Sequence, residues 1–316
     1  MPQPSSSVRF DGVTVRYAGA DRNAVDGVSL EIPSGAFTVL LGPSGCGKST
    51  LLRTVNRLAV PVKGTVYVGD TDAAALDPIE LRRNIGYVIQ AVGLFPHMTV
   101  AQNISVVPSL LRWDRARIAA RIDELLELVS LDPSRYRGRY PRELSGGEQQ
   151  RVGVARAIAA EPQVLLMDEP FGAVDAIVRA SLQDEVHRIA RRLNATIVFV
   201  THDVDEALRL ADRIVVMRDG KVEQYDTPLR ILTSPANAYV AQLLDTGDTI
   251  RRLGLLRVQD AMRSVDGTVD AYIDGARSLR EALNAFLNGA RVLGVQKSGE
   301  LAGILDFDDV RRALRA

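Results

Sequence analysis

The sequence predicts an α/β fold in which a parallel sheet carries helices on its faces. Short apolar runs typical of buried strands alternate along the chain with segments of helical periodicity, an alternation typical of parallel sheets. A glycine-rich turn at residues 42–49 follows one such apolar run and precedes a helix-forming segment. The length of 316 residues suggests about two domains. A hydrophobic content of 46% and a charged content of 25% are ordinary for a globular chain with a sizeable core.

The strands of this fold are predicted by short apolar or alternating runs. Residues 8–40 alternate with a period close to two, which indicates a sheet with one buried face. Further strands are predicted at residues 64–69, 85–90, 164–167, 196–200 and 214–217. Between them, the chain is helical in pattern from about residue 100 to residue 158. Asp114 is placed to cap a helix there whose apolar face is Ile118, Ile122, Leu125, Leu126 and Val129. We therefore expect a helical subdomain, at about residues 95–160, inserted into the α/β core.

A second, smaller domain is predicted after residue 245, where the regular alternation of strands and helices stops. Three further strands are predicted at residues 269–273, 291–295 and 301–305. Ser278 and Glu281 have the spacing of a capping box that opens a helix, and residues 297–300 are typical of a hairpin turn. With a short last helix, residues 246–316 are predicted to form a β-α-β-β-α unit.

The glycine-rich turn has the spacing G-x-x-x-x-G-K-S of a phosphate-binding loop. Its glycines allow successive backbone N–H groups to converge on one anion, and the helix N-terminus adds partial positive charge. Lys48 supplies an ammonium group for the β- and γ-phosphates, and the Ser49 hydroxyl is a ligand for Mg²⁺. The sequence therefore predicts binding of a nucleoside triphosphate and Mg²⁺. The predicted binding residues of the loop are Gly42, Pro43, Ser44, Gly45, Cys46, Gly47, Lys48, Ser49 and Thr50.

Polar residues at three strand ends are the candidates for hydrolysis. Asp168 and Glu169 follow a buried strand, so Asp168 is predicted to hold Mg²⁺ and Glu169 to orient or deprotonate the attacking water. His202 follows the next strand and is a candidate to contact the γ-phosphate and this water. Gln90 ends an earlier strand and can reach Mg²⁺ and the water. The alternative is that these groups are solvated or structural, as we interpret His97 and His187.

Composition excludes several classes of protein. Lys plus Arg and Asp plus Glu both number 39, so the net charge is zero and no nucleic-acid partner is indicated. The single cysteine excludes an internal disulfide and is typical of a reducing compartment. No apolar run approaches the roughly 20 residues that a membrane-spanning helix needs. The expected location is therefore the cytoplasm, with any membrane-spanning work done by another chain.

The segment Leu144-Ser-Gly-Gly-Glu148 resembles the signature motif of ABC-transporter ATPases, and the other motifs occur in that family's order over about residues 8–240. The resemblance implies a P-loop NTPase core of ABC type with an antiparallel β subdomain. It also implies a homodimer of ATPase subunits in which ATP on one copy meets the signature of the other. The residues assigned by resemblance are Ser145, Gly146 and Gly147 on the γ-phosphate, Tyr17 on adenine and Asp175 at the dimer interface.

Two segments, residues 93–104 and residues 169–175, resemble the importers of quaternary-ammonium osmoprotectants such as glycine betaine, choline and carnitine. This resemblance implies transmembrane permease subunits as partners, and indirectly an extracytoplasmic solute-binding protein. The chain would then lie at the cytoplasmic face of the cell membrane. The membrane subunits would dock near Gln90 and residues 91–100, where Leu94, Phe95 and Met98 suit a partner groove if exposed; burial of one or more of them is the equal alternative.

The C-terminal unit resembles one cystathionine-β-synthase-type (CBS) motif, through residues 258–262, the helix from Ser278 and residues 299–305. A single motif leaves one sheet face unburied, so we expect the units of two protomers to pair. Where nucleotide-binding versions carry Ser or Thr followed by Asp, this chain has Asp306 and Asp309. Asp309 could still hold a ribose, but Asp306 would repel a phosphate. We therefore expect a dimerisation or ionic-strength-sensing unit that binds adenosine nucleotides poorly, with a plain spacer as the alternative.

Three alternatives to the osmoprotectant importer stay open at this point. The same ATPase could serve another small solute, such as an amino acid or a polyamine. A soluble ATP switch in translation or DNA repair is a second reading, although such relatives tend to have two fused ATPase halves or long coiled coils. A nucleotide sensor that binds ATP without turnover is the third, and Glu169 argues against it.

Overall fold

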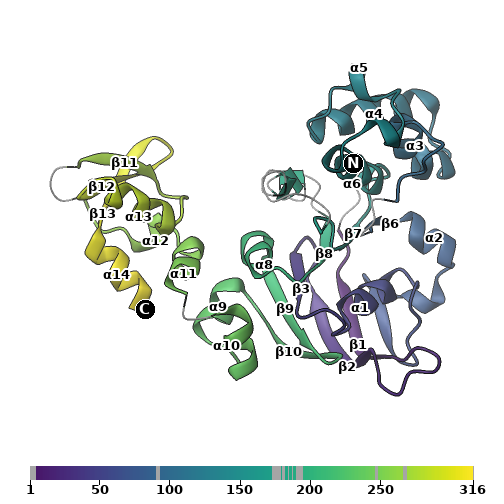
Figure 1. Ribbon diagram of the computed structural model, residues 1–316, viewed down its shortest axis with the longest axis horizontal. Coiled ribbons are helices and arrows are strands. Elements are labelled where there is room, and N and C mark those ends of the chain that lie inside the picture. The colour runs from purple at the N-terminus through teal and green to yellow at the C-terminus, as the bar shows by residue number, and fades with distance from the viewer. Residues whose placement is uncertain are drawn as a thin grey trace. The chain divides into compact units, whose positions relative to one another are not determined.

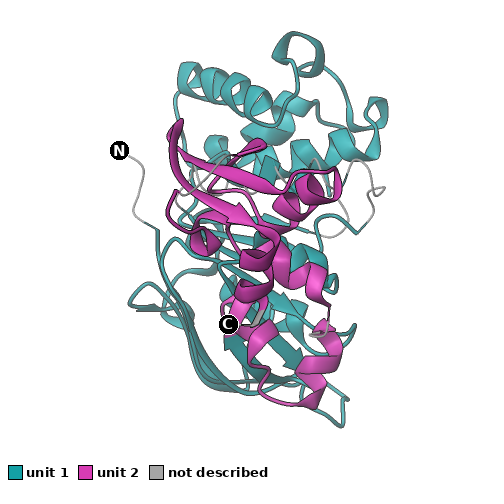
Figure 2. Cartoon of the chain, turned by 90° about the vertical axis from the view of Figure 1, so that its left-hand side faces the viewer, with its two compact units in different colours: residues 1–225 teal, residues 226–316 magenta. Residues whose placement is uncertain are grey.

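The computed structural model describes residues 5–89, 93–172, 179, 182–183, 185–186, 188–189, 195–245, 248–265 and 269–315. The chain forms two compact units, residues 1–225 and residues 226–316 (Figure 2). This division lies earlier in the chain than the predicted boundary after residue 245. The second unit begins earlier because it includes helices α9 (Pro228–Thr233) and α10 (Ala238–Leu244). These two helices pack against each other, and α9 also packs against α11 (Thr249–Leu255).

A six-stranded sheet forms the centre of the first unit (Figure 1), in the order β10-β9-β3-β8-β7-β6. The strands are β3 (Phe37–Leu41), β6 (Ile85–Val88), β7 (Val164–Asp168), β8 (Thr196–Thr201), β9 (Arg213–Arg218) and β10 (Lys221–Asp226). β3 pairs in parallel with β8 and β9, and β7 with β6 and β8. Every side chain of β3, β7 and β8 is buried. The predicted parallel sheet is thus confirmed, and the carboxyl ends of β3, β7 and β8 meet at one edge.

A second, antiparallel sheet in the same unit has the order β2-β1-β4-β5. Its strands are β1 (Val8–Val15), β2 (Val25–Ile32), β4 (Lys63–Val68) and β5 (Thr71–Asp72). Side chains from β1 and β2 share one hydrophobic core with Leu51, Leu52 and Val55 of helix α1 (Lys48–Val55). This core fixes α1, and with it the glycine-rich turn, between the two sheets. The antiparallel subdomain implied by the family resemblance is confirmed.

The helical subdomain is inserted between β6 and β7, as predicted (Figure 1). It consists of α3 (Val100–Leu110), α4 (Arg115–Leu128), α5 (Pro133–Tyr136) and α6 (Gly146–Ile158), with a 3-10 turn at Pro141–Glu143. Asp114 caps α4 by accepting the Arg117 N–H at 2.9 Å. Four residues of the predicted apolar face are buried, namely Ile122, Leu125, Leu126 and Val129, while Ile118 is half-buried.

Short elements complete the first unit. Helix α2 (Pro78–Arg83) precedes β6, helix α8 (Val204–Leu210) follows β8, and a 3-10 turn at Ala73–Ala75 follows β5. Throughout the part of the chain that the structure describes, each helix is too short or too polar to cross a membrane.

The second unit contains a three-stranded sheet in the order β11-β12-β13, with β11 parallel and β13 antiparallel to the central strand. Its elements after α11 are α12 (Val258–Ala261), β11 (Ala271–Asp274), α13 (Leu279–Leu287), β12 (Val292–Lys297), β13 (Glu300–Asp306) and α14 (Phe307–Arg315). The predicted β-α-β-β-α order is confirmed. The capping box is present, because the N–H of Ser278 donates to Glu281 at 2.9 Å and the N–H of Glu281 to the Ser278 hydroxyl at 3.4 Å.

The two faces of this small sheet differ. Leu293, Val295 and Leu305 are buried in a core that the helices also line. On the other face, Tyr272 and Leu301 lie over Gly294, where a Cβ atom would come within 2.8 Å of the Tyr272 ring. Tyr272 is 61% exposed and Leu301 41% exposed. Ile304, which pairs with Gly294 and shares this face, is fully buried, so among the described residues the face is open only around Tyr272 and Leu301.

Candidate functional site

The glycine-rich turn connects β3 to α1 and is packed closely against its neighbours. Gly42 has φ +154, and a Cβ atom there would lie 2.3 Å from the carbonyl oxygen of Met217. Gly47 has φ +104, and its Cβ would lie 2.2 Å from the carbonyl oxygen of Ala24. Only glycine fits these two positions without a shift of the neighbouring backbone. Gly45, at φ +81, instead faces open space.

Lys48 begins α1 and folds back into the turn. Its side chain is buried, and Nζ donates to the carbonyl oxygens of Gly42 at 2.7 Å and Pro43 at 2.9 Å. The turn therefore holds a fixed positive charge beside its backbone N–H groups, as an anion site requires. The Cys46 thiol lies 3.9 Å from Nζ. Burial raises the pKa of this thiol, although Lys48 acts in the opposite direction.

Asp168, at the end of β7, is joined to α1 by two hydrogen bonds. The Ser49 hydroxyl donates to Oδ1 at 2.6 Å, and Arg53 donates to Oδ2 at 3.0 Å. Asp168 is only 3% exposed, so these bonds offset the cost of burying a carboxylate. The sequence reasoning missed Arg53. Its position four residues after Ser49 places it on the same face of α1, which was the available signal.

The oxygen atoms of Ser49 and Asp168 are suitable ligands for Mg²⁺, which prefers hard oxygen donors. Among the residues with described positions, no group of three or more His, Cys, Asp or Glu could hold a metal ion. The pair fits a magnesium ion that is bound together with phosphate oxygens and water, which is the usual arrangement for this metal.

Glu169 and His202 come from neighbouring strand ends and lie together. The Nδ1 atom of His202 is 3.4 Å from Oε2 of Glu169. The backbone of Glu169 has φ +46, and its N–H donates to the carbonyl of Val200 on β8 at 3.1 Å. A positive φ is uncommon outside glycine, and such strain is concentrated at functional sites. The two predicted catalytic side chains thus share the sheet edge that also carries Asp168.

A buried network next to His202 was not predicted. The Thr201 hydroxyl donates to Glu206 of α8 at 2.6 Å and accepts the Asp203 N–H at 3.0 Å. Gln183 donates to the second carboxylate oxygen of Glu206 at 3.0 Å. Burial raises the pKa of Glu206. Hydrogen bonds made by Thr201 and Asp203, the residues on either side of His202, therefore hold this turn in place.

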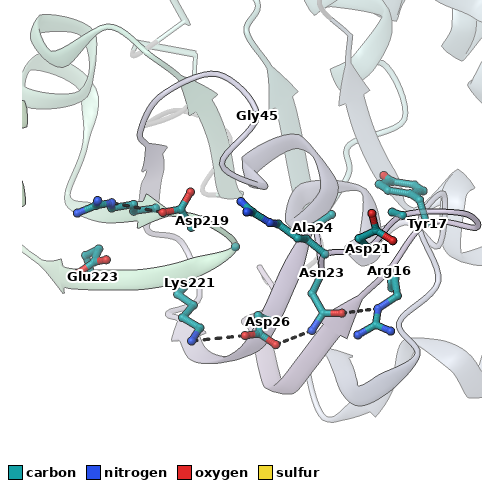
Figure 3. Close-up of a pocket in the computed structure, with 14 residues that line it drawn as sticks. Arg16, Tyr17, Asp21, Asn23, Ala24, Asp26, Gly45, Asp219, Lys221 and Glu223 are labelled. Atoms are coloured by element: carbon teal, nitrogen blue, oxygen red, sulfur yellow. Dashed lines mark hydrogen bonds and ion pairs between the residues drawn. The ribbon is translucent and has the colours of Figure 1, made fainter.

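A polar pocket of about 760 Å³ lies beside Tyr17 and Gly45 (Figure 3). Tyr17 is 49% exposed, and its hydroxyl is 3.1 Å from the Thr50 hydroxyl. Across the pocket, Asn23 accepts from Arg16 at 2.8 Å and donates to Asp26 at 2.7 Å (Figure 3). The other residues that line the pocket are Ala20, Asp21, Arg22, Ala24, Arg218, Asp219, Gly220, Lys221 and Glu223. The pocket is therefore next to the phosphate loop and has room for a nucleoside.

The signature segment opens α6 in the helical subdomain, separate from α1 (Figure 1). Ser145 is the N-cap of α6, and Ser145 and Gly146 are exposed. Gln90, Asp175 and His187 lie outside the described residues, so their predicted roles stay predictions.

The structure distinguishes exposed from half-buried residues in the docking segment. Phe95 is 41% exposed, but Leu94 and Met98 are half-buried. Asn103 of α3 accounts for the packing of this segment, because it accepts the Phe95 N–H and donates to the carbonyls of Phe95, Met98 and Thr99. These bonds hold the segment against α3.

Comparison with known proteins gives matches over both units. Residues 25–172 match the sequence pattern of the ABC transporter family. The chain is 51% identical over 237 residues to the carnitine transport ATP-binding protein OpuCA of Listeria monocytogenes, covering 75% of this chain and 59% of that protein. The chain thus spans about three fifths of the length of this relative. It is 49% identical over 306 residues to the glycine betaine uptake system ATP-binding protein YehX of Escherichia coli, covering 96% of this chain and 98% of that protein.

A solved structure supports the fold. The dimeric structure of a post-hydrolysis state of the ATP-binding cassette MJ0796, bound to ADP and Pi, is similar with a TM-score of 0.63 and 32% sequence identity. The similarity covers 70% of this chain and 98% of that chain.

Proposed function

Because this chain belongs to the ABC transporter ATP-binding family, we propose that it is the ATP-hydrolysing subunit of an importer for quaternary-ammonium osmoprotectants. Hydrolysis is supported by the position of Asp168, Glu169 and His202, which lie together at the sheet edge next to Lys48 and Ser49. The observation that supports the solute class is the similarity, over nearly its whole length, to the glycine betaine uptake protein of Escherichia coli.

In this proposal the chain binds ATP along the edge of the six-stranded sheet. The adenine stacks on Tyr17 beside the polar pocket, and the phosphates lie in the turn of residues 42–49, where Lys48 holds its positive charge. Ser49 and Asp168 would hold Mg²⁺, which neutralises phosphate charge when bound. Glu169 orients the attacking water and takes up its proton, while the contact with His202 fixes the carboxylate.

The site is completed by a second copy of the chain. Ser145, Gly146 and Gly147 stand at a helix N-terminus, where backbone N–H groups and the helix dipole favour an anion. In a head-to-tail homodimer these groups would meet the γ-phosphate bound to the other copy. The dimeric state of the similar MJ0796 cassette, described with ADP and Pi, supports this arrangement. Gln90 and Asp175 keep their predicted roles at the metal and the interface.

The membrane subunits are the second class of partner. A groove of about 330 Å³ runs between β6, α3 and α6, and Tyr87, Ile89, Phe95 and Val107 are among its lining residues. This apolar groove, with Arg156 at its side, would receive a segment of a transmembrane permease subunit. The chain would then act at the cytoplasmic face of the membrane, and a separate solute-binding protein would select the solute.

The C-terminal unit is proposed to regulate or strengthen the dimer. Arg263 lies 3.0 Å from Asp306, the carboxylate that we expected to repel a phosphate, and 3.3 Å from Asp309. The same contacts occupy both carboxylates, which supports a unit that binds adenosine nucleotides poorly. The exposed face with Tyr272 and Leu301 is the surface on which two units would pair.

The test is uptake of radiolabelled glycine betaine and choline at low and high osmolarity, in cells that carry the wild type or Lys48→Ala. We expect uptake to collapse in the variant and to respond to osmolarity in the wild type. If uptake of both solutes is the same in the wild type and in Lys48→Ala, the osmoprotectant assignment is rejected. Amino acids and polyamines would then be tested in the same cells.

A further inference from the structure

The signature segment holds a closed set of hydrogen bonds around Glu148. The backbone N–H of Ser145 donates to Oε2 of Glu148 at 2.7 Å, and the backbone N–H of Glu148 donates to the Ser145 hydroxyl at 3.3 Å. The hydroxyl of Tyr136, at the end of α5, donates to Oε1 of Glu148 at 2.5 Å. Both oxygens of this carboxylate therefore have a donor, and the two donors come from different segments.

These bonds decide which groups of Ser145 are available to a ligand. Its N–H and one hydroxyl lone pair are used by Glu148, and its C=O accepts the Gln149 N–H at 2.9 Å. The Ser145 side chain also hydrogen-bonds the Glu148 carboxylate, so that carboxylate helps to set where the hydroxyl points. The N–H groups of Gly146 and Gly147 belong to the first turn and have no acceptor within the helix. Two N–H donors, with the Ser145 hydroxyl beside them, thus lie together where an anion is favoured.

Glu148 is also a negative charge beside this anion site. A carboxylate that rotated freely would repel an incoming phosphate and would leave the Ser145 hydroxyl without a fixed direction. The hydrogen bond from Tyr136 is the largest cause that lowers the pKa of Glu148, so the group stays ionised while it is held. Arg139, whose guanidinium lies 4.8 Å from the centroid of the Tyr136 ring, adds positive charge on the same side.

We propose that Tyr136 is a positioning residue for the signature serine: it holds the Glu148 carboxylate, and with it the Ser145 hydroxyl, in position to meet a phosphate of the facing copy. This inference rests on the proposed function, in which ATP on a second copy meets Ser145. The inference adds Tyr136, a residue outside the signature motif, to the groups needed when two copies close around ATP.

A plain helix cap is the competing interpretation. A cap stabilises α6, so its loss lowers the melting temperature but leaves each folded molecule as active as before. A positioning role weakens the one step in which Ser145 meets the phosphate of the other copy. Binding of nucleotide to the phosphate loop of a single chain is then unchanged, and kcat and ATP-driven dimerisation fall together.

The experiment compares the full-length wild type with Tyr136→Phe, Glu148→Gln and the double variant. Tyr225→Phe is the matched control, because it removes a hydroxyl that donates to the Glu31 carbonyl at 2.9 Å in another part of the unit. Each protein is measured for melting temperature, Kd for a fluorescent ATP analogue under monomeric conditions, and kcat and KM for ATP. Dimerisation by ATP is measured by light scattering in a Glu169→Gln background.

For Tyr136→Phe we expect kcat and the dimerisation constant to fall about tenfold, the effect of one lost hydrogen bond to a charged group. The monomer Kd stays within about twofold of wild type. The double variant is no worse than the more severe single variant, because both changes act through one bond. Tyr225→Phe leaves kcat and dimerisation as they are.

Unchanged kcat and dimerisation in Tyr136→Phe, or effects that multiply in the double variant, would overturn the inference. If the wild type dimerises in the presence of ATP but does not hydrolyse it, only the proposed function is overturned. The dimerisation constants of the variants then decide the role of Tyr136. If ATP does not dimerise the wild type, both the proposed function and the role of Tyr136 are overturned, because no phosphate from a second copy reaches Ser145.

Discussion

The Ser49 hydroxyl donates a 2.6 Å hydrogen bond to Oδ1 of Asp168, which joins the first turn of α1 to the end of β7 across 119 positions of sequence. This contact places the hydroxyl of the phosphate loop and the carboxylate of the strand end at one point. The second carboxylate oxygen is held by Arg53 at 3.0 Å. The proposed magnesium site is thus already formed by the packing of α1 against the sheet.

Asp168→Asn tests this contact. We expect it to abolish the Mg²⁺ dependence of ATP binding and to lower turnover by at least about a hundredfold, because the neutral amide is a poor ligand and loses the charge that pairs with Arg53. The measurement is ATP turnover and nucleotide affinity against Mg²⁺ concentration. Asp212→Asn is the control, since Asp212 accepts the Phe37 N–H at 2.9 Å at the opposite edge of the sheet. A full Mg²⁺ response in Asp168→Asn would exclude Asp168 from the metal site.

Glu169→Gln is expected to keep ATP binding and to lower kcat about 100- to 10,000-fold, the usual contribution of a general base. His202→Ala is expected to act through the same carboxylate, so the two effects should not multiply in the double variant. Single-turnover kinetics with radiolabelled ATP measure both. The control is His97→Ala, which changes an exposed histidine outside the site. Turnover of Glu169→Gln within threefold of wild type would remove Glu169 from the mechanism.

Glu206 predicts a pH dependence of stability. Burial raises the pKa of Glu206 in the folded chain, so the folded state binds this proton more tightly than the unfolded state. The resulting stability is complete below the unfolded pKa and is lost as pH rises through the folded pKa. One such proton changes the free energy of unfolding by at most about 1.4 kcal/mol per pH unit.

Glu206→Gln should remove this contribution, because glutamine keeps a carbonyl oxygen and cannot ionise. Urea denaturation between pH 4 and pH 8, at intervals of about half a unit, gives the slope of unfolding free energy against pH. Glu127→Gln, on an exposed position of α4, should retain the wild-type slope. Identical slopes for wild type and Glu206→Gln would contradict the raised pKa.

Gly47→Ala and Gly45→Ala form a matched pair in the phosphate loop. Both residues have positive φ, but only the Cβ at Gly47 would meet backbone, at 2.2 Å from the Ala24 carbonyl oxygen. We expect about 1–2 kcal/mol of destabilisation at Gly45 from conformation alone. A larger loss is expected at Gly47, together with loss of nucleotide binding. Chemical denaturation and nucleotide titration measure both quantities. Equal effects at the two positions would show that the close contact does not matter.

Local features of this chain were predictable from the sequence. The glycines at the turn, the Ser278–Glu281 capping box, the Asp114 cap and the strand positions all depend on residues a few places apart, and all are present. Glu169 and His202 were correctly placed at one sheet edge, because both follow buried strands whose carboxyl ends meet. The sequence left open whether Leu94, Phe95 and Met98 are exposed, because exposure depends on packing against α3, where Asn103 donates to the Met98 carbonyl.

The remaining contacts join segments far apart in the chain, and they follow from packing. The sheet order puts β3 between β8 and β9, and no local pattern states that order. Three hydrogen bonds depend on how helices pack against strands or other helices. They are those from Arg53 to Asp168, from Tyr136 to Glu148 and from Thr201 to Glu206. Residue type and spacing determined which groups could bind phosphate and activate water. Burial and the three-dimensional arrangement of the strands and helices decided which other side chains hold those groups in position.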